Sequence, residues 1–269
     1  MLKTRVITAI ALLAVFLPVT LFAPVAAFGV LIRIVVVFAA WEWARLLKAG
    51  KIGSIVYAAV AAVVVVLSAQ LEAPRALFQA AGVFWIVAGP YVLLRKPVLS
   101  AGAWRVFLLA AGLVIFAACW HALVAARVAG VAFVLSLLLV VWLADIGAYF
   151  AGKAFGRHKL APAISPGKTW EGAVGGWVAV MVVSVAAIAL HAFEPTFYSA
   201  LAAHLGLGRA FFVLTVLVAF SVVGDLFESM LKRQAGVKDS SGLLPGHGGV
   251  LDRIDALLPV LPLAMLLLG

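Results

Sequence analysis

Half of the acidic residues of this chain lie in one polar segment near the C-terminus. The chain has ten Asp and Glu residues, and five of them fall between positions 225 and 255. These five are Asp225, Glu228, Asp239, Asp252 and Asp255, and the same segment carries Lys232, Arg233, Lys238, His247 and Arg253. Carboxylate oxygens suit Mg²⁺, and cations beside them neutralise phosphate oxygens in a transfer reaction. The segment therefore predicts a metal-assisted site for phosphate chemistry.

The spacing of these residues predicts how they are presented. Asp225, Glu228, Ser229 and Lys232 stand at i, i+3, i+4 and i+7, so on a helix they share one face. Asp252 and Asp255 also share a face, at the start of the last apolar stretch. Between them, residues 245–249 read Pro-Gly-His-Gly-Gly, which lets backbone N–H groups approach a ligand. The alternative is a solvated network of salt bridges, which explains the polarity of the segment but not the clustering of half the acids.

A second polar segment spans residues 145–176. Asp145 and Tyr149 stand at i and i+4 near the end of an apolar helix, and an acid inside a membrane span is a functional candidate by default. Its alternative is an interfacial residue paired with Lys153 or Arg157. The run from Ser165 to Thr169 precedes a helix and predicts a phosphate-binding helix start with Lys168 as the counter-charge. Thr169 can instead be an ordinary N-cap. The spacing of a Walker A loop is missing.

The elements that must position these residues are membrane helices. The chain has 269 residues, of which 67% are apolar and 11% charged, and its mean hydropathy is +1.24. A soluble domain has an apolar share nearer one half. We therefore expect an all-α, polytopic integral membrane bundle of about nine transmembrane helices with cytoplasmic active-site loops, although eight or ten spans also fit. The expected spans are residues 6–22, 27–44, 55–70, 77–94, 106–126, 131–150, 172–193, 211–227 and 251–268.

The basic residues predict the orientation of these spans. With a cytoplasmic N-terminus, sixteen of the twenty Lys and Arg residues fall inside, as the positive-inside rule requires. They are Lys3, Arg5, Arg45, Lys48, Lys51, Arg95, Lys96, Arg105, Lys153, Arg157, Lys159, Lys168, Lys232, Arg233, Lys238 and Arg253. The net charge of +10 is therefore a topology signal, and we expect no nucleic-acid partner. Because the apolar pattern continues after residue 22, we expect an uncleaved first span rather than a signal peptide.

Other polar residues carry weaker signals. The single cysteine, Cys119, excludes an internal disulfide framework and a four-cysteine metal site. His121, His191 and His204 have no partners at ligand spacing. The run Trp41-Glu42-Trp43 is interpreted as part of an aromatic belt at the membrane interface.

The C-terminal segment resembles the phosphatidate cytidylyltransferases, or CDP-diacylglycerol synthases. Their pattern is S-x-x-K-R-x4-K-D-x-[GSA]-x2-[LIF]-[PG]-x-H-G-G-x2-D-R-x-D, and every specified position is met. The matching residues are Ser229, Lys232, Arg233, Lys238, Asp239, Ser241, Leu244, Pro245, His247, Gly248, Gly249, Asp252, Arg253 and Asp255. Residues 145–152 and 165–172 are similar to two further elements of the family. The N-terminal half matches only in hydropathy and in the Ala-Trp-Glu-Trp-Ala-Arg run.

The resemblance implies transfer of the cytidylyl group of CTP to phosphatidate in the bilayer, giving CDP-diacylglycerol and pyrophosphate with Mg²⁺. It favours Asp225 and Asp252 as metal ligands, facing each other across the Gly-rich turn, with Asp145 and Asp255 next. It also allows a monovalent cation such as K⁺. Together with His247 and Lys232, the first two are our catalytic candidates. The candidates for substrate binding are Ser165, Lys168, Thr169, Ser229, Arg233, Lys238, Asp239, Gly248, Gly249 and Arg253.

These expectations divide the chain into N-terminal transmembrane helices (1–130) and a C-terminal transmembrane catalytic region (131–269). We expect a multi-pass protein of the inner (plasma) membrane, and a homodimer stays open. A CDP-alcohol phosphotransferase is disfavoured because its D-G-x2-A-R-x8-G-x3-D-x3-D pattern is missing. A transporter or channel would place acids along several spans rather than at one face of the membrane.

Overall fold

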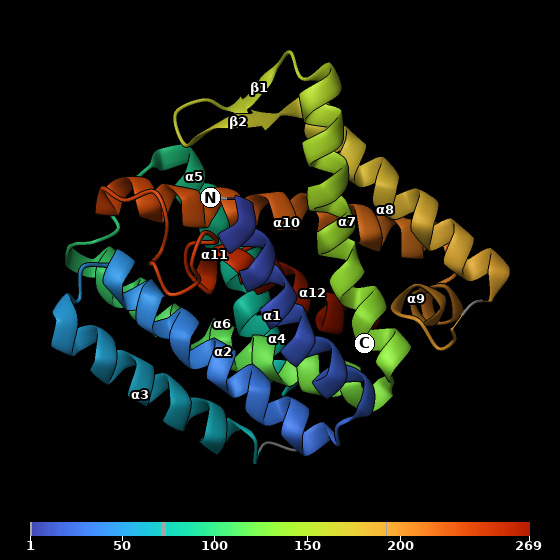
Figure 1. Cartoon of the computed structure of the whole chain (residues 1–269), viewed down its shortest axis with the longest axis horizontal. Coiled ribbons are helices and arrows are strands. Elements are labelled where there is room, and N and C mark those ends of the chain that lie inside the picture. Colours follow the sequence, from blue (N-terminus) through green and yellow to red (C-terminus); the bar gives the residue numbers. More distant parts are fainter. Residues whose placement is uncertain (1, 71–73, 192) are drawn as a thin grey trace.

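The protein is a bundle of helices with one short hairpin at its edge (Figure 1). The computed structural model describes residues 2–70, 74–191 and 193–269. The helices of the first half are α1 (Leu2–Phe22), α2 (Val25–Leu46), α3 (Gly50–Ser68), α4 (Arg75–Val83), the π-helix η1 (Phe84–Ala88), α5 (Gly89–Arg95) and α6 (Gly102–Ala129). The second half contains α7 (Val131–Phe155), β1 (Lys159–Ala161), β2 (Ser165–Thr169), α8 (Trp170–Leu190), α9 (Phe197–Leu205), α10 (Leu207–Ala235), α11 (Leu251–Ile254) and α12 (Leu257–Leu268).

Seven helical segments are long and apolar enough to cross a membrane: α2, α3, the continuous run Arg75–Arg95, α6, α7, α8 and α10. They correspond to the second through eighth predicted spans, so the polytopic α-helical class is confirmed. The count of nine is not confirmed. The apolar part of α1 covers only Val6–Phe22. At a rise of about 1.5 Å per residue, the 12 residues of α12 extend about 18 Å, well short of a hydrocarbon core of about 30 Å.

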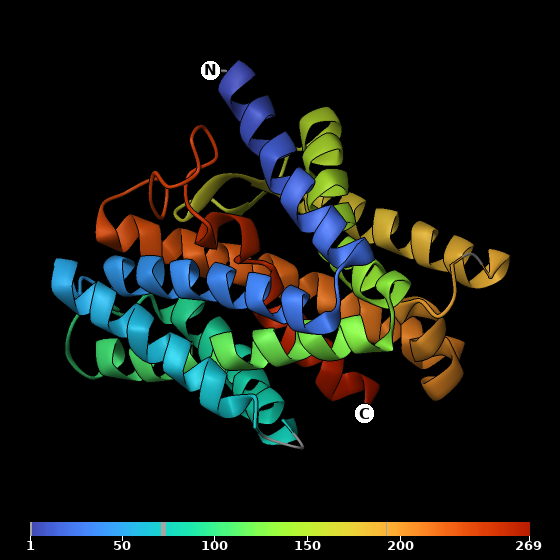
Figure 2. The same ribbon diagram turned by 60° about the horizontal axis from the view of Figure 1, so that its bottom comes forward.

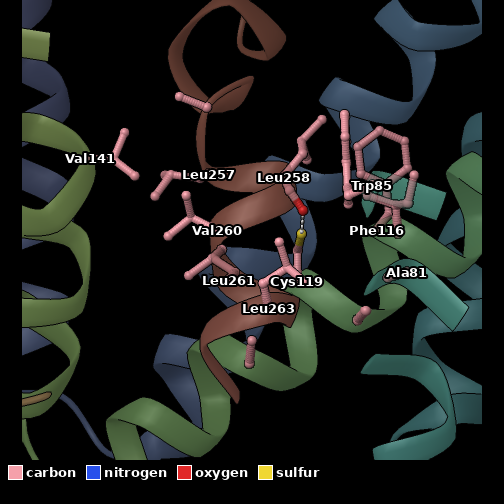
Figure 3. Close-up of a cluster of buried hydrophobic side chains, with 14 of the residues drawn as sticks. Ala81, Trp85, Phe116, Cys119, Val141, Leu257, Leu258, Val260, Leu261 and Leu263 are labelled. Carbon is pink, nitrogen blue, oxygen red and sulfur yellow. Dashed lines mark hydrogen bonds between the residues drawn. The ribbon is translucent and has the colours of Figure 1, made fainter. Parts of the chain in front are cut away.

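Helix α12 lies inside the bundle, where it packs against α10, α4 and α6. Figure 3 shows Leu258 on the side of Trp85 and Phe116, while Leu257 and Leu261 point toward Val141 on α7. The thiol of Cys119 on α6 donates a hydrogen bond to the backbone oxygen of Leu258, with a distance of 3.6 Å between sulfur and oxygen. Since Leu258, Val260 and Leu261 are all nearly inaccessible, this helix fills the interior. It also joins helices from both sides of the boundary predicted at residue 130.

Helices α7 and α8 touch backbone to backbone. A side-chain carbon on Gly147 would lie 2.8 Å from the backbone oxygen of Gly175, and one on Gly176 would collide with the backbone oxygen of Ala144. Small residues allow such an approach between membrane helices. The contact brings Asp145 on α7 close to the start of α8.

The antiparallel hairpin of β1 and β2 was not expected from the sequence. It pairs Lys159 with Thr169 and Ala161 with Ser165, and it joins the end of α7 to the start of α8 (Figure 1). In Figure 2 the hairpin, the N-terminal end of α1 and the loop before α11 lie on the same side of the bundle. Thr8 on α1 confirms this proximity, because its hydroxyl donates a 2.9 Å hydrogen bond to the backbone oxygen of Pro245.

Candidate active site

Two lysine–aspartate pairs connect α10 with β2 and with α11. Lys168 Nζ on β2 lies 2.7 Å from Asp225 Oδ2, and Lys232 Nζ lies 2.6 Å from Asp252 Oδ1. Lys232 also pairs with Glu228, one helical turn earlier. The structure therefore brings Lys168, which is distant in sequence, to the acidic cluster.

Helix α10 presents its polar residues on one face, as their spacing predicted. The hydroxyl of Ser229 donates to Asp225 Oδ1 at 3.3 Å, and Glu228 reaches Lys232 at i+4. Asp225 stands ten residues before the last residue of α10, which places it about 15 Å from that end of the helix. Asp225 thus lies nearly three helical turns before the C-terminal end of α10.

A cavity of about 290 Å³ opens between α7, α8, β2 and α10. Its polar lining includes Asp145, Tyr149, Lys168 and Asp225, and its walls include small and apolar residues such as Gly172, Val218 and Val222. A cavity with apolar walls and a few convergent charges is typical of a small-molecule site. Asp145, a second-tier metal candidate from the sequence, therefore lines the same cavity as Lys168 and Asp225.

The carboxylate of Asp252 is enclosed by donors. Oδ1 receives Lys232, while Oδ2 accepts hydrogen bonds from the backbone N–H of Ser240 (2.9 Å), the hydroxyl of Ser240 (2.9 Å) and the backbone N–H of Gly249 (2.7 Å). Burial raises the pKa of this carboxyl, but Lys232 and the backbone N–H donors outweigh burial and lower the pKa to about 2. Asp252 is therefore ionised throughout the physiological pH range.

Residues 244–247 form a type II β-turn that closes around Asp252. The backbone N–H of His247 donates to the backbone oxygen of Leu244 at 2.8 Å, with Pro245 at the second position and Gly246 (φ +76°) at the third, as this turn type requires. Gly248 follows with φ +81°, and a side-chain carbon there would lie 2.5 Å from Asp252 Oδ2. The Gly-rich run predicted to bring backbone N–H groups to a ligand is thus an ordered turn, and its Gly249 N–H donates to a carboxylate of the chain itself.

Glu42 is a member of the site that the sequence analysis missed. It lies on α2 and is fully buried. Its carboxylate accepts hydrogen bonds from the hydroxyls of Ser240 and Ser241 and from the backbone N–H groups of Val250 and Leu251. An aromatic belt is therefore the wrong interpretation of this residue. The available signal was an acid within an apolar span, which by default indicates a functional site.

The remaining predicted residues lie around this centre. Thr169 caps α8 by accepting the N–H of Gly172 at 3.1 Å, so its N-cap interpretation is confirmed, and Ser165 begins β2. Arg233 Nε donates to the backbone oxygen of Ile164 at 3.3 Å. Lys238, Asp239 and Arg253 are exposed. Within the described ranges, Nδ1 of His247 is buried without a hydrogen-bond partner.

The donor set bears on the predicted Mg²⁺ ligands. In residues 2–70, 74–191 and 193–269, no group of three or more His, Cys, Asp and Glu side chains is arranged to hold a metal ion. Asp225 and Asp252 each belong to a separate ion pair with a lysine. Asp145 and Asp225 line the same cavity, and their hard oxygens fit Mg²⁺. Asp252 would first have to release donors that now occupy both of its oxygens.

Comparison with known proteins shows the family of this chain. The sequence profile described as the cytidylyltransferase family matches residues 3–269. A phosphatidate cytidylyltransferase of Pseudomonas aeruginosa is 43% identical over 276 residues, which cover 100% of this chain and 97% of that protein. The enzymes of the same name from Haemophilus influenzae and Staphylococcus haemolyticus are 50% and 43% identical over 134 and 144 residues. These matches cover 49% and 54% of this chain, and 44% and 52% of those proteins. The chain therefore belongs to the cytidylyltransferase family.

Proposed function

We propose that this chain transfers the cytidylyl group of CTP to phosphatidate, giving CDP-diacylglycerol and pyrophosphate for phospholipid synthesis. The observation that carries the proposal is that α10 carries two lysine–aspartate pairs, Lys168–Asp225 and Lys232–Asp252, in a bundle of membrane helices. Cations among carboxylates suit a triphosphate, and the surrounding helices suit a lipid substrate. The full-length relative in Pseudomonas aeruginosa bears the name of this activity.

In the proposed reaction, a phosphate oxygen of phosphatidate attacks the α-phosphorus of CTP. A new P–O bond forms there, the bond to the bridging oxygen of the β-phosphate breaks, and pyrophosphate leaves. Lys168 and Lys232 bind phosphate oxygens and stabilise the negative charge that develops on the leaving group. Asp225 and Asp252 orient these lysines while the site is empty of substrate. No covalent enzyme intermediate is needed. Much of the catalysis comes from holding both reactants in line.

We also propose Mg²⁺ at the carboxylates of Asp225 and Asp145, with Asp252 and Asp255 as further candidates and K⁺ as a second cation. Bound Mg²⁺ would neutralise charge on the triphosphate and orient it. Asp225 would then exchange its pairing with Lys168 for the metal, leaving the ammonium group free for phosphate oxygens.

The chain is a multi-pass membrane protein, and we propose the inner membrane with a cytoplasmic N-terminus. The Thr8–Pro245 hydrogen bond supports this orientation, because it puts the start of α1 on the side of the site, where CTP is available. A homodimer stays a prediction.

The test is an assay of detergent-solubilised protein with labelled CTP, phosphatidate and Mg²⁺. Wild type should form CDP-lipid, and Asp252→Asn and Asp225→Asn should reduce its formation by about 100-fold or more. The proposal is wrong if wild type forms no CDP-lipid or if both variants keep full activity.

A further inference from the structure

Glu42 is a buried acid whose hydrogen bonds all come from one distant part of the chain. Oε2 accepts from Leu251 N at 2.6 Å and from Ser240 Oγ at 3.0 Å. Oε1 accepts from Ser241 Oγ at 2.5 Å and from Val250 N at 3.1 Å. These donors lie about 200 positions later in the sequence. Among the described residues no Lys, Arg or His forms an ion pair with Glu42. Its buried carboxyl is compensated by two backbone N–H groups, the Ser241 hydroxyl and the single Ser240 hydroxyl proton, which is shared with Asp252.

The helix side of this contact is anchored independently. Next to Glu42, the indole of Trp43 donates to the backbone oxygen of Leu108 on α6 at 3.0 Å, and α2 packs along both α3 and α6. The other side is the C-terminal loop (residues 236–250), which between α10 and α11 has no regular helix or strand. Glu42 is therefore the fixed group, and the loop is what it holds.

The residues that Glu42 holds are the ones that surround Asp252. Ser240 Oγ lies 3.0 Å from Glu42 Oε2 and 2.9 Å from Asp252 Oδ2, so one hydroxyl stands between the two carboxyl groups. Gly249, whose N–H donates to Asp252, packs so closely that a side-chain carbon would collide with both Ser240 Oγ and Glu42 Oε1. Val250 and Leu251 directly precede Asp252. Each residue that donates to Glu42 therefore either donates to Asp252 itself or is adjacent in sequence to such a donor or to Asp252.

We infer that Glu42 is a positioning residue of the active site. It fixes the C-terminal loop so that Ser240 and Gly249 hold the Asp252 carboxylate against Lys232. Glu42 touches no substrate in this role, and the inference rests on the proposed cytidylyl transfer. Because a displacement of about 1 Å in a catalytic group costs about 100-fold in rate, loosening this loop should reduce turnover strongly.

Kinetics of Glu42→Gln and Glu42→Ala form the first test. Glutamine keeps the shape but presents an NH₂ group to N–H and O–H donors, so kcat/KM should fall about 10-fold, and about 100-fold in Glu42→Ala. The matched control is Trp120→Phe, which removes a buried 2.9 Å hydrogen bond from α6 to the backbone oxygen of Gly29 on α2 and leaves the loop untouched. It should lower the melting temperature without lowering kcat/KM comparably.

A double variant separates positioning from general stability. If Glu42 acts partly through Ser240, then Glu42→Gln combined with Ser240→Ala should lose less activity than the product of the two single losses. A purely structural role predicts multiplicative losses, and that outcome would overturn the inference. If Glu42→Ala does not fold, the cycle still stands on Glu42→Gln.

Limited trypsin digestion tests the loop without any assay of activity. Lys238 is exposed within the loop, and Lys159 is exposed on β1. Cleavage after Lys238 should be at least about 5-fold faster in Glu42→Gln than in wild type, while cleavage after Lys159 should be unchanged. Equal rates after Lys238 in both proteins would refute the positioning role. If wild type forms no CDP-lipid but the digestion behaves as expected, the proposed function fails while Glu42 still holds the loop.

Discussion

A side-chain carbon on Gly224 would lie 2.5 Å from the backbone oxygen of Asp255. Helix α10 therefore touches the junction of α11 and α12 through bare backbone, one residue before Asp225. Pro259 also contacts this position, with its ring carbons 2.8 Å from the same point. Because residue 224 has no side chain, Asp225 on α10 and Asp255 at the end of α11 can approach each other.

Gly224→Ala should therefore separate these acids. Overpacking of this kind costs about 1–3 kcal/mol of stability, and the displaced carboxylates should lower kcat/KM by about 100-fold. The control is Gly208→Ala on the same helix, where nothing lies within 4 Å of the added carbon. Steady-state assays and melting curves of both variants check this. Equal activity of the two variants would contradict the proposed importance of the contact.

Lys168→Gln should lower kcat/KM for CTP by about 100-fold, because the variant removes a cation that faces Asp225 in the cavity. Lys159→Gln on the paired strand changes the net charge equally, so it serves as the control and should keep near wild-type activity. Both are measured with varied CTP at fixed phosphatidate. Similar losses in both variants would indicate a general effect of surface charge.

The lowered pKa of Asp252 predicts how stability depends on pH. Because its pKa in the folded protein is about 2, below its ordinary value of 3.8, ionised Asp252 contributes stability above about pH 4. That contribution, about 2 kcal/mol, is lost as the pH falls toward 2. The melting-temperature difference between wild type and Asp252→Asn should be constant from pH 6 to 8 and should narrow below about pH 4. A difference that widens on acidification would contradict this account.

Chelation should abolish activity, and Mg²⁺ should restore it, if the proposed carboxylates hold the metal. Asp145→Asn should raise the Mg²⁺ concentration needed for half-maximal rate by about 10-fold. Glu194→Gln, which alters a half-exposed acid paired with His191, should leave this concentration unchanged. Full activity in excess chelator would refute the metal proposal.

Hydropathy predicted seven of the spans because a membrane helix must be apolar along its whole length. The same criterion predicted that α12 crosses the membrane. An apolar helix can instead lie in the interior of a bundle, and the buried leucines of α12 show that it does so here. The hairpin was missed because β1 and β2 have only 3 and 5 residues, and Pro and Gly in β2 mask its strand character.

The site was predictable where its residues are close in sequence. The face of α10 that joins Asp225 to Lys232 follows from helical periodicity alone. The pairing of Lys168 with Asp225 and the contacts of Glu42 depend on helix packing, which local spacing does not encode. In the sequence, Glu42 stands between two tryptophans, and nothing there connects it with Ser240.

The contacts of Glu42 also bear on the order in which the protein is assembled. During synthesis α2 is made before residues 240–251, so Glu42 at first lacks the hydrogen-bond donors that later surround its carboxyl. Synthesis of α2 therefore precedes formation of these contacts, and a chain that stops before residue 240 would leave the Glu42 carboxyl without all four of its donors.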